Sequence, residues 1–99
     1  MATEQTTFAF DPAKSPPIHP GLHVARELHE RHMTQRELAL QMRRPARLVT
    51  EIVNGRKAVT ADTALDLEKA LEIEALQWLN MQSLYDLSVA RLRRQQRTA

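Results

Sequence analysis

The sequence predicts an all-α protein, a compact five-helix domain that follows an N-terminal arm. Apolar residues recur at helical spacing from residue 20 onward, and capping signals separate the successive apolar runs. Gly and Pro are both absent from 56 to 99, which favours helix throughout that half. We find neither a strand pattern nor an internal repeat. Because 99 residues suit one small domain, we expect that domain to span residues 18–94.

Residues 1–17 show no helical period and contain three of the five prolines of the chain. Their large apolar side chains are Phe8 and Phe10. This composition predicts a flexible arm. The alternation of apolar residues around Phe8 and Phe10 leaves a second interpretation open, in which the arm forms a short strand or docks on a partner.

Each of the first two helices has a start signal. Pro20 suits the first turn of a helix over about residues 20–32, because its missing N–H has no helical partner there. Thr34 and Glu37 have the spacing of a capping box, in which each side chain bonds the backbone of the other residue. The second helix is therefore expected to follow Thr34 and to end at about Met42.

The third and fourth helices are marked in the same way. Pro45 can open the third helix, and Gly55 ends it because glycine adopts the left-handed C-cap conformation at little cost. Thr60 is an N-cap candidate ahead of a helix over about residues 61–71. Leu48 falls on the outward edge of the third helix without an explanation. The apolar stripe of the third helix is Val49, Ile52 and Val53, and the apolar positions of the fourth are Ala64, Leu65, Leu67, Ala70 and Leu71.

The fifth helix is expected from about Ala75 toward Arg94, before a frayed tail over residues 95–99. Its apolar side chains exceed what one helix face usually buries in so small a domain, so we expect it to form a homodimer. The alternative is that Trp78 and Tyr85 only fill the core of the monomer. The residues expected to dimerise are Trp78, Leu79, Leu84, Tyr85 and Val89.

Residues 34–55 are the most informative stretch, because they read as two short amphipathic helices joined by a tight turn. That is the layout of a helix-turn-helix, in which one helix braces and the next enters the major groove of DNA. With its apolar stripe turned inward, the second of these helices presents Ala46, Arg47 and Thr50 to solvent. Arg47 can pair with O6 and N7 of guanine, Thr50 can bond a base or a phosphate, and Ala46 can touch a thymine methyl.

Basic residues gather around the same helix, although the net charge of the chain is only +2. Arg44, in the turn, is placed to reach a base edge or the DNA backbone, and Arg56 and Lys57 are expected to grip phosphates. Surface helices often carry arginine, so the cluster alone does not decide between DNA binding and a solvated face. Its members are Arg43, Arg44, Arg47, Arg56 and Lys57.

Four segments in a fixed order identify a family. They are Ile18-His19-Pro20-Gly21, then Glu51-Ile52-Val53-Asn54-Gly55, then Val59-Thr60-Ala61-Asp62-Thr63-Ala64-Leu65, and last Trp78-Leu79-Asn80-Met81-Gln82 with Tyr85-Asp86-Leu87 after it. Together with the helix-turn-helix they resemble the HigA-type antitoxins of the Xre, or phage-repressor-like, family. The resemblance covers about residues 18–90. It implies that Gln35, in the first turn of the second helix, contacts a phosphate.

The resemblance also implies a function. Such proteins act as dimers on inverted-repeat operator DNA, repress their own operon and neutralise a HigB-type mRNA endonuclease encoded beside them. The toxin would meet either the arm, through Phe8 and Phe10, or the outer face of the first two helices. Two alternatives remain open at this stage: a free-standing Xre-family regulator without a toxin, and a helical interaction module whose helix-turn-helix has lost its affinity for DNA.

The chain departs from the family pattern at two turns. Arg43 stands where the turn after the second helix usually has Gly, and an arginine in the left-handed conformation costs on the order of 1 kcal/mol. Glu72 and Glu74 occupy the usual Gly and Pro positions between the fourth and fifth helices. The sequence therefore leaves open the shape of the first turn and the angle between the last two helices.

Other classes of function find little support in the sequence. Cysteine is absent, His29 and His32 lack the spacing of a zinc protease motif, and there is neither a Ser-His-Asp set nor a glycine-rich phosphate loop. We expect no enzyme activity, metal or cofactor. No apolar run approaches the roughly 20 residues of a membrane span, and no secretory signal is visible. The expected location is the cytoplasm.

Overall fold

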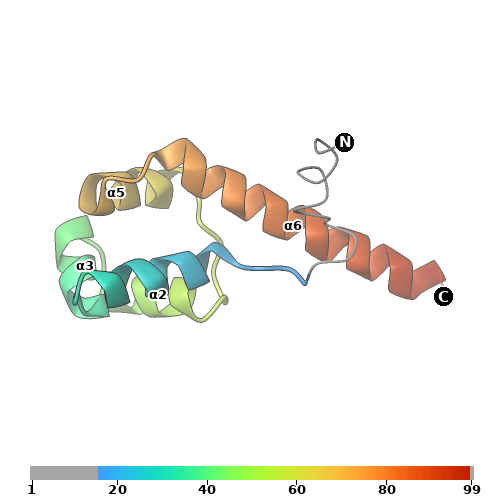
Figure 1. The fold of residues 1–99 in the computed structure, drawn as a ribbon, viewed down its shortest axis with the longest axis horizontal. Helices are drawn as coiled ribbons and strands as arrows, with labels where there is room; N and C mark the ends of the chain where they lie inside the picture. The colour runs from blue at the N-terminus through green and yellow to red at the C-terminus, as the bar shows by residue number, and fades with distance from the viewer. Residues whose placement is uncertain (1–15, 99) are drawn as a thin grey trace, which may run out of the picture.

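Five α-helices and no strands make up residues 16–98, the part of the chain that the structure, a computed structural model, describes (Figure 1). The all-α prediction is confirmed. The predicted arm falls mostly on residues 1–15, which lie outside the described residues, as does Ala99. The helices are α2 Pro20–Glu30, α3 Gln35–Met42, α4 Ala46–Val53, α5 Ala61–Leu71 and α6 Ala75–Thr98.

The start of α2 packs directly on the end of α4. His19 is the N-cap, and its Nδ1 atom accepts a 2.9 Å hydrogen bond from the backbone N–H of Gly21. A Cβ atom at Gly21 would lie 1.8 Å from the carbonyl oxygen of Ile52, which no side chain tolerates. Glycine at this position therefore lets the two helices approach through their backbones. His19 itself is buried.

The connection from α3 to α4 keeps the left-handed turn in spite of its arginine. The predicted capping box of α3 is complete, with Glu37 N donating to Thr34 Oγ1 at 3.0 Å and Thr34 N donating to Glu37 Oε1 at 2.8 Å. At the other end Arg43 adopts φ 57° and ψ 42°. Pro45 is the N-cap of α4 rather than its first residue, so that helix begins one residue later than predicted.

The hydrophobic core lies where α2, α3, α4 and α5 meet the first half of α6. Trp78 of α6 has no exposed surface and is among the largest buried side chains, together with Leu38 and Ile52. Leu48, left without an explanation by the sequence, is also buried. It lies within about 40° of Ile52 on a helical wheel, so the inward face of α4 is wider than the predicted stripe. The buried apolar residues are Val24, Leu28, Leu38, Ala39, Met42, Leu48, Val49, Ile52, Val59, Ala64, Leu67, Leu71 and Trp78.

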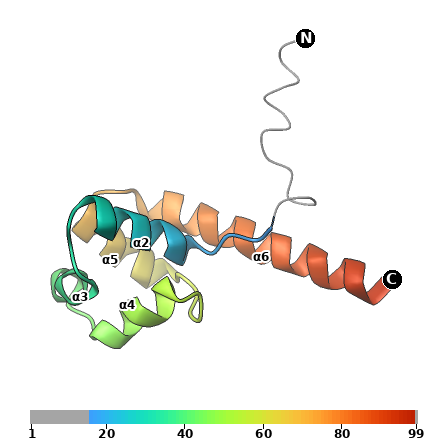
Figure 2. The same ribbon diagram turned by 60° about the horizontal axis from the view of Figure 1, so that its bottom comes forward.

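The long helix α6 extends beyond the other helices, and its C-terminal half projects from the bundle (Figures 1 and 2). It continues to Thr98, so residues 95–98, predicted to fray, are helical. Arginine and glutamine, which dominate this end, are good helix formers, and no Gly or Pro interrupts them. None of the helices in the described part is both long and apolar enough to cross a membrane.

The link between α5 and α6 is short and has its own bonds. Glu72 adopts the left-handed conformation with φ 59°, as the glycine usual at this position would. The carboxylate of Glu68 then accepts a 2.9 Å hydrogen bond from the backbone N–H of Ala75. This bond satisfies one of the free N–H groups at the start of α6 and sets where that helix begins.

Candidate nucleic-acid interface

The outward face of α4 is open to solvent. Ala46, Arg47 and Thr50 are exposed, whereas Val49 and Ile52 on the opposite face are 1 % exposed. In both views of the ribbon α4 lies across the bundle from the start of α6 (Figures 1 and 2). The orientation predicted for Arg47 and Thr50 is confirmed, and this face is free to enter a groove.

Two of the predicted contact residues, 15 positions apart in the chain, meet at this face. The Thr50 hydroxyl lies 2.8 Å from Gln35 Oε1 and 3.2 Å from the carbonyl oxygen of Ala46, and it can donate to either. Gln35 is the first residue of α3. The bond therefore ties the start of the bracing helix to the middle of the recognition helix, and it places both side chains on one surface.

A carboxylate that the sequence interpretation overlooked lies among the cations. Glu51 Oε2 accepts a 3.1 Å bond from Arg47 Nε, and its other oxygen is 3.9 Å from Lys57 Nζ. The Arg47 side chain remains 85 % exposed. The i, i+4 spacing of Arg47 and Glu51 was visible in the sequence. The contact with Lys57 was not, because it depends on how the chain turns after α4.

Arg44, in the turn before α4, is paired with a residue of α5. Its Nη1 atom forms a 2.7 Å ion pair with Oδ2 of Asp66 on α5, and both side chains are about one-third exposed. Asp66 is 22 positions away, and no local pattern connects the two residues. The pair ties the turn between α3 and α4 to α5, and the predicted contact of Arg44 with a base edge or the DNA backbone stays a prediction.

The loop after α4, which carries Arg56 and Lys57, is anchored to α6 by hydrogen bonds. Gly55 has φ 74° and both cations are exposed. Further along, Val59 N donates to Oε1 of the buried Gln82 at 2.8 Å, and Gln82 Nε2 donates to Asp86 at 2.9 Å. The sequence interpretation quoted Gln82 only within a family segment, and the structure shows that it anchors this loop to α6.

His19 supports the same loop from the other side. Its ring packs edge-on against Tyr85 of α6, with 4.9 Å between ring centroids. Burial lowers the pKa of His19, while a hydrogen bond to the backbone of Lys57 and the charge of Asp86 act in the opposite direction. Because Nδ1 accepts from Gly21, the neutral ring with its proton on Nε2 fits this site.

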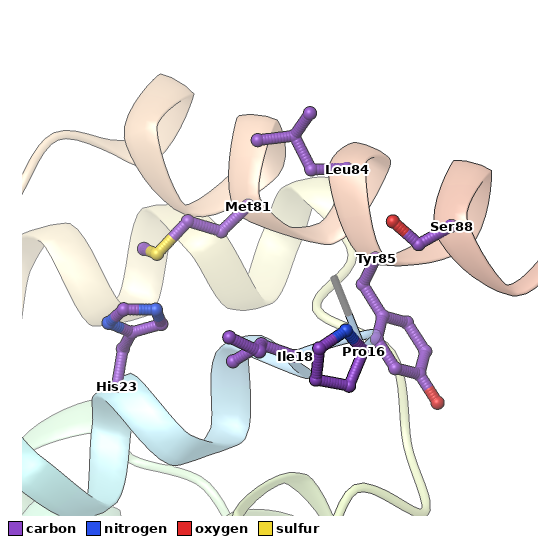
Figure 3. A pocket seen from close by; sticks show the side chains of 7 residues that line it. All are labelled: Pro16, Ile18, His23, Met81, Leu84, Tyr85 and Ser88. Carbon is purple, nitrogen blue, oxygen red and sulfur yellow. The ribbon is translucent and has the colours of Figure 1, made fainter. Parts of the chain in front are cut away.

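The residues predicted to dimerise divide into two groups. Trp78 is fully buried in the monomer, so the predicted contact of this side chain with a partner is wrong. Leu84 is 47 % exposed, and Leu79, Tyr85 and Val89 are partly exposed on α6. Leu84 and Tyr85 also border an open cavity of about 130 Å³. Across it lie Pro16 and Ile18 (Figure 3).

The described residues contain no cluster of three or more His, Cys, Asp or Glu side chains suited to a metal ion. His19 has its nitrogen engaged as a helix cap. The polar groups at the surface of α4 are instead donors and cations, with a single carboxylate between them. Such a surface suits the base edges and phosphates of a duplex.

Comparison with known proteins agrees with this geometry. The profile of the helix-turn-helix family matches residues 22–79. Virulence-associated protein I of Dichelobacter nodosus is 39 % identical over 77 residues, which are 76 % of this chain and 70 % of that protein. An addiction module antidote protein of the HigA family from Coxiella burnetii superposes with a TM-score of 0.79 at 38 % identity, over 84 % of this chain and 91 % of that one. The antitoxin HigA of Pseudomonas aeruginosa, solved with the higBA promoter, gives a TM-score of 0.77 at 31 % identity, over 83 % and 90 % of the two chains.

Proposed function

Because the chain belongs to the helix-turn-helix family of HigA-type antitoxins, we propose that it binds its own operator as a dimer, represses its operon and neutralises a HigB-type mRNA endonuclease. The observation that carries the DNA-binding part is the exposed face of α4, with Arg47 and Thr50 turned outward. The similar antitoxin from Pseudomonas aeruginosa was solved with promoter DNA, which supports DNA binding by this chain.

In the proposed complex α4 lies in the major groove. Arg47 pairs with a guanine, and Ala46 touches a thymine methyl. Thr50 exchanges its bond to Gln35 for a base or phosphate, which also frees Gln35 for the phosphate backbone. Arg56 and Lys57, just beyond the helix, contact phosphates. Arg44 contributes indirectly, by holding the turn against Asp66.

A second copy is needed because one such unit reads only a few base pairs. Helix-turn-helix dimers place their recognition helices about 34–36 Å apart on an inverted repeat, or a multiple of that distance. The surface proposed for the dimer is the exposed side of α6. Leu84 lies at its centre, Leu87 and Leu92 continue it, and Leu79, Tyr85 and Val89 flank it.

The test is direct. The purified protein is titrated into duplexes from its own promoter and into scrambled duplexes, and it is also co-expressed with the product of the neighbouring reading frame. We expect selective binding to the promoter and copurification of a small basic protein whose toxicity is relieved. Selective DNA binding without any toxin partner would indicate a free-standing regulator. Equal or absent binding to all duplexes would refute the DNA-binding role.

A further inference from the structure

One carboxylate stands on the DNA-facing surface, where phosphates will approach. Glu51 follows Arg47 by one helical turn, accepts its Nε–H at 3.1 Å and lies 3.9 Å from Lys57 Nζ. Its side chain is 30 % exposed, much less than that of Arg47. A group that repels phosphate therefore sits between a cation proposed to read a base and a cation proposed to grip the backbone.

We propose that Glu51 is a specificity-determining residue, which keeps Arg47 and Lys57 from binding arbitrary DNA. This inference rests on the proposed DNA binding. The bond to Arg47 uses Nε, and the two terminal nitrogens of the guanidinium stay available for the O6 and N7 atoms of guanine. An exposed i, i+4 pair is weak, so it biases the arginine toward one direction without locking it.

The charge of Glu51 acts differently on the two kinds of DNA. Attraction to a random sequence is almost wholly electrostatic, so a carboxylate beside two cations weakens it directly. At the operator, the guanine contact made by Arg47 is gained in addition to the phosphate contacts. Discrimination increases when a repulsive group lowers binding to the wrong partner more than binding to the right one. The carboxylate thereby widens the ratio between operator and random DNA.

The experiment compares Glu51→Gln with the wild-type protein, on operator and scrambled duplexes of equal length at several salt concentrations. Releasing the two cations should strengthen binding to scrambled DNA about threefold to eightfold and steepen its log–log salt dependence by about one. Operator affinity should change less, so the specificity ratio falls. A folding defect cannot imitate this result, because an unfolded protein does not bind random DNA more tightly.

Two further variants separate charge from contact. Glu51→Asp keeps the charge but is too short to hold Arg47, so binding to scrambled DNA should stay at the wild-type level while operator affinity falls. Glu27→Gln is the matched control, because Glu27 of α2 forms the same kind of i, i+4 pair, at 3.0 Å, with Arg31, the C-cap of that helix. It should change neither affinity.

The results distinguish the proposed DNA-binding function from the proposed role of Glu51. If the wild-type protein does not prefer its operator, the proposed function fails and the question about Glu51 falls with it. If the wild-type protein prefers its operator and Glu51→Gln leaves the ratio unchanged, only the role of Glu51 is refuted. If Glu51→Gln weakens operator binding without any gain on scrambled DNA, the carboxylate reads a base directly and the inference is overturned.

Discussion

Arg47 is the residue with the largest consequence for sequence recognition. Its side chain is 85 % exposed on the outward face of α4, and a bidentate pair with guanine contributes about 1–3 kcal/mol of discrimination. We expect Arg47→Ala to weaken operator binding by about that amount and scrambled DNA much less. Fluorescence anisotropy titrations measure both, and Arg26→Ala, which removes an exposed arginine from α2, is the control. Equal losses on both duplexes would show that Arg47 only positions the protein.

Lys57 differs from Arg47 in the kind of contact expected. A lysine on phosphate carries no sequence information, so Lys57→Ala should weaken binding to every duplex alike. It should also reduce the log–log salt slope by about one. The same titrations, repeated from low to moderate salt, give that slope. A selective loss on the operator would contradict the phosphate assignment.

His19 makes the stability of the fold depend on pH. Burial lowers its pKa in the folded state below the ordinary 6.5, because the neutral ring is favoured there. Well above pH 6.5, His19 is neutral in both the folded and the unfolded state, and its full contribution to the free energy of unfolding is present. Below 6.5 the unfolded state is protonated first, so stability falls until the pH reaches the folded pKa. Urea unfolding at several pH values should show this loss in the wild-type protein and a flatter profile in His19→Gln, and equal profiles for the two proteins would contradict the role of His19.

At the scale of the helices, the contact between α2 and α4 depends on one missing side chain. Gly21→Ala would place its Cβ 1.8 Å from the Ile52 carbonyl, and backbone must move to relieve it. We expect a loss of about 3 kcal/mol or more in the free energy of unfolding. Gly55→Ala is the matched comparison, because its Cβ would meet nothing closer than 3.8 Å and only the positive φ is strained. That strain costs about 1 kcal/mol. Urea unfolding of both variants tests the difference, and equal losses would contradict it.

Two of the three left-handed non-glycine residues in the described part of the chain, Arg43 and Glu72, show how a helix end tolerates an unfavourable side chain; the third is His32. Arg43 and Glu72 stand where the resemblance to the family led us to expect glycine, yet both adopt φ values near those of a left-handed cap. Tertiary bonds compensate at each place. Arg44, next to the first turn, pairs with Asp66, and Glu68, before the second, bonds the start of α6. The geometry of both turns is therefore kept by packing and by bonds to neighbouring helices rather than by conformational preference.

At the scale of the whole molecule, α6 serves both the monomer and the proposed dimer. Its buried face supplies Trp78 and Gln82 to the core, and its exposed face carries Leu84, Leu87 and Leu92. Leu84→Asp should abolish the dimer by burying a charge at its centre, and operator affinity should fall because one half-site is then read alone. Light scattering measures the mass. Leu65→Asp, at a leucine that is 56 % exposed on α5, should leave the dimer intact. A dimer that survives Leu84→Asp would place the interface elsewhere.

The sequence by itself determined which helices form and placed most of their ends to within a few residues, because those signals are local. The capping box at Thr34 and Glu37, the N-cap at Thr60 and the helix stop at Gly55 each act within a few residues, and helical periodicity set which side of α4 faces out. The outward position of Arg47 followed from that periodicity alone.

Only the tertiary structure decided which distant residues meet. It placed Trp78 in the core, turned Arg44 toward Asp66 and set Glu51 between Arg47 and Lys57. No local sequence pattern predicts two further hydrogen bonds, which join Thr50 to Gln35 and Val59 to Gln82. Such contacts depend on how whole helices pack against one another, and packing follows from the shape of the shared core rather than from the spacing of residues along one helix.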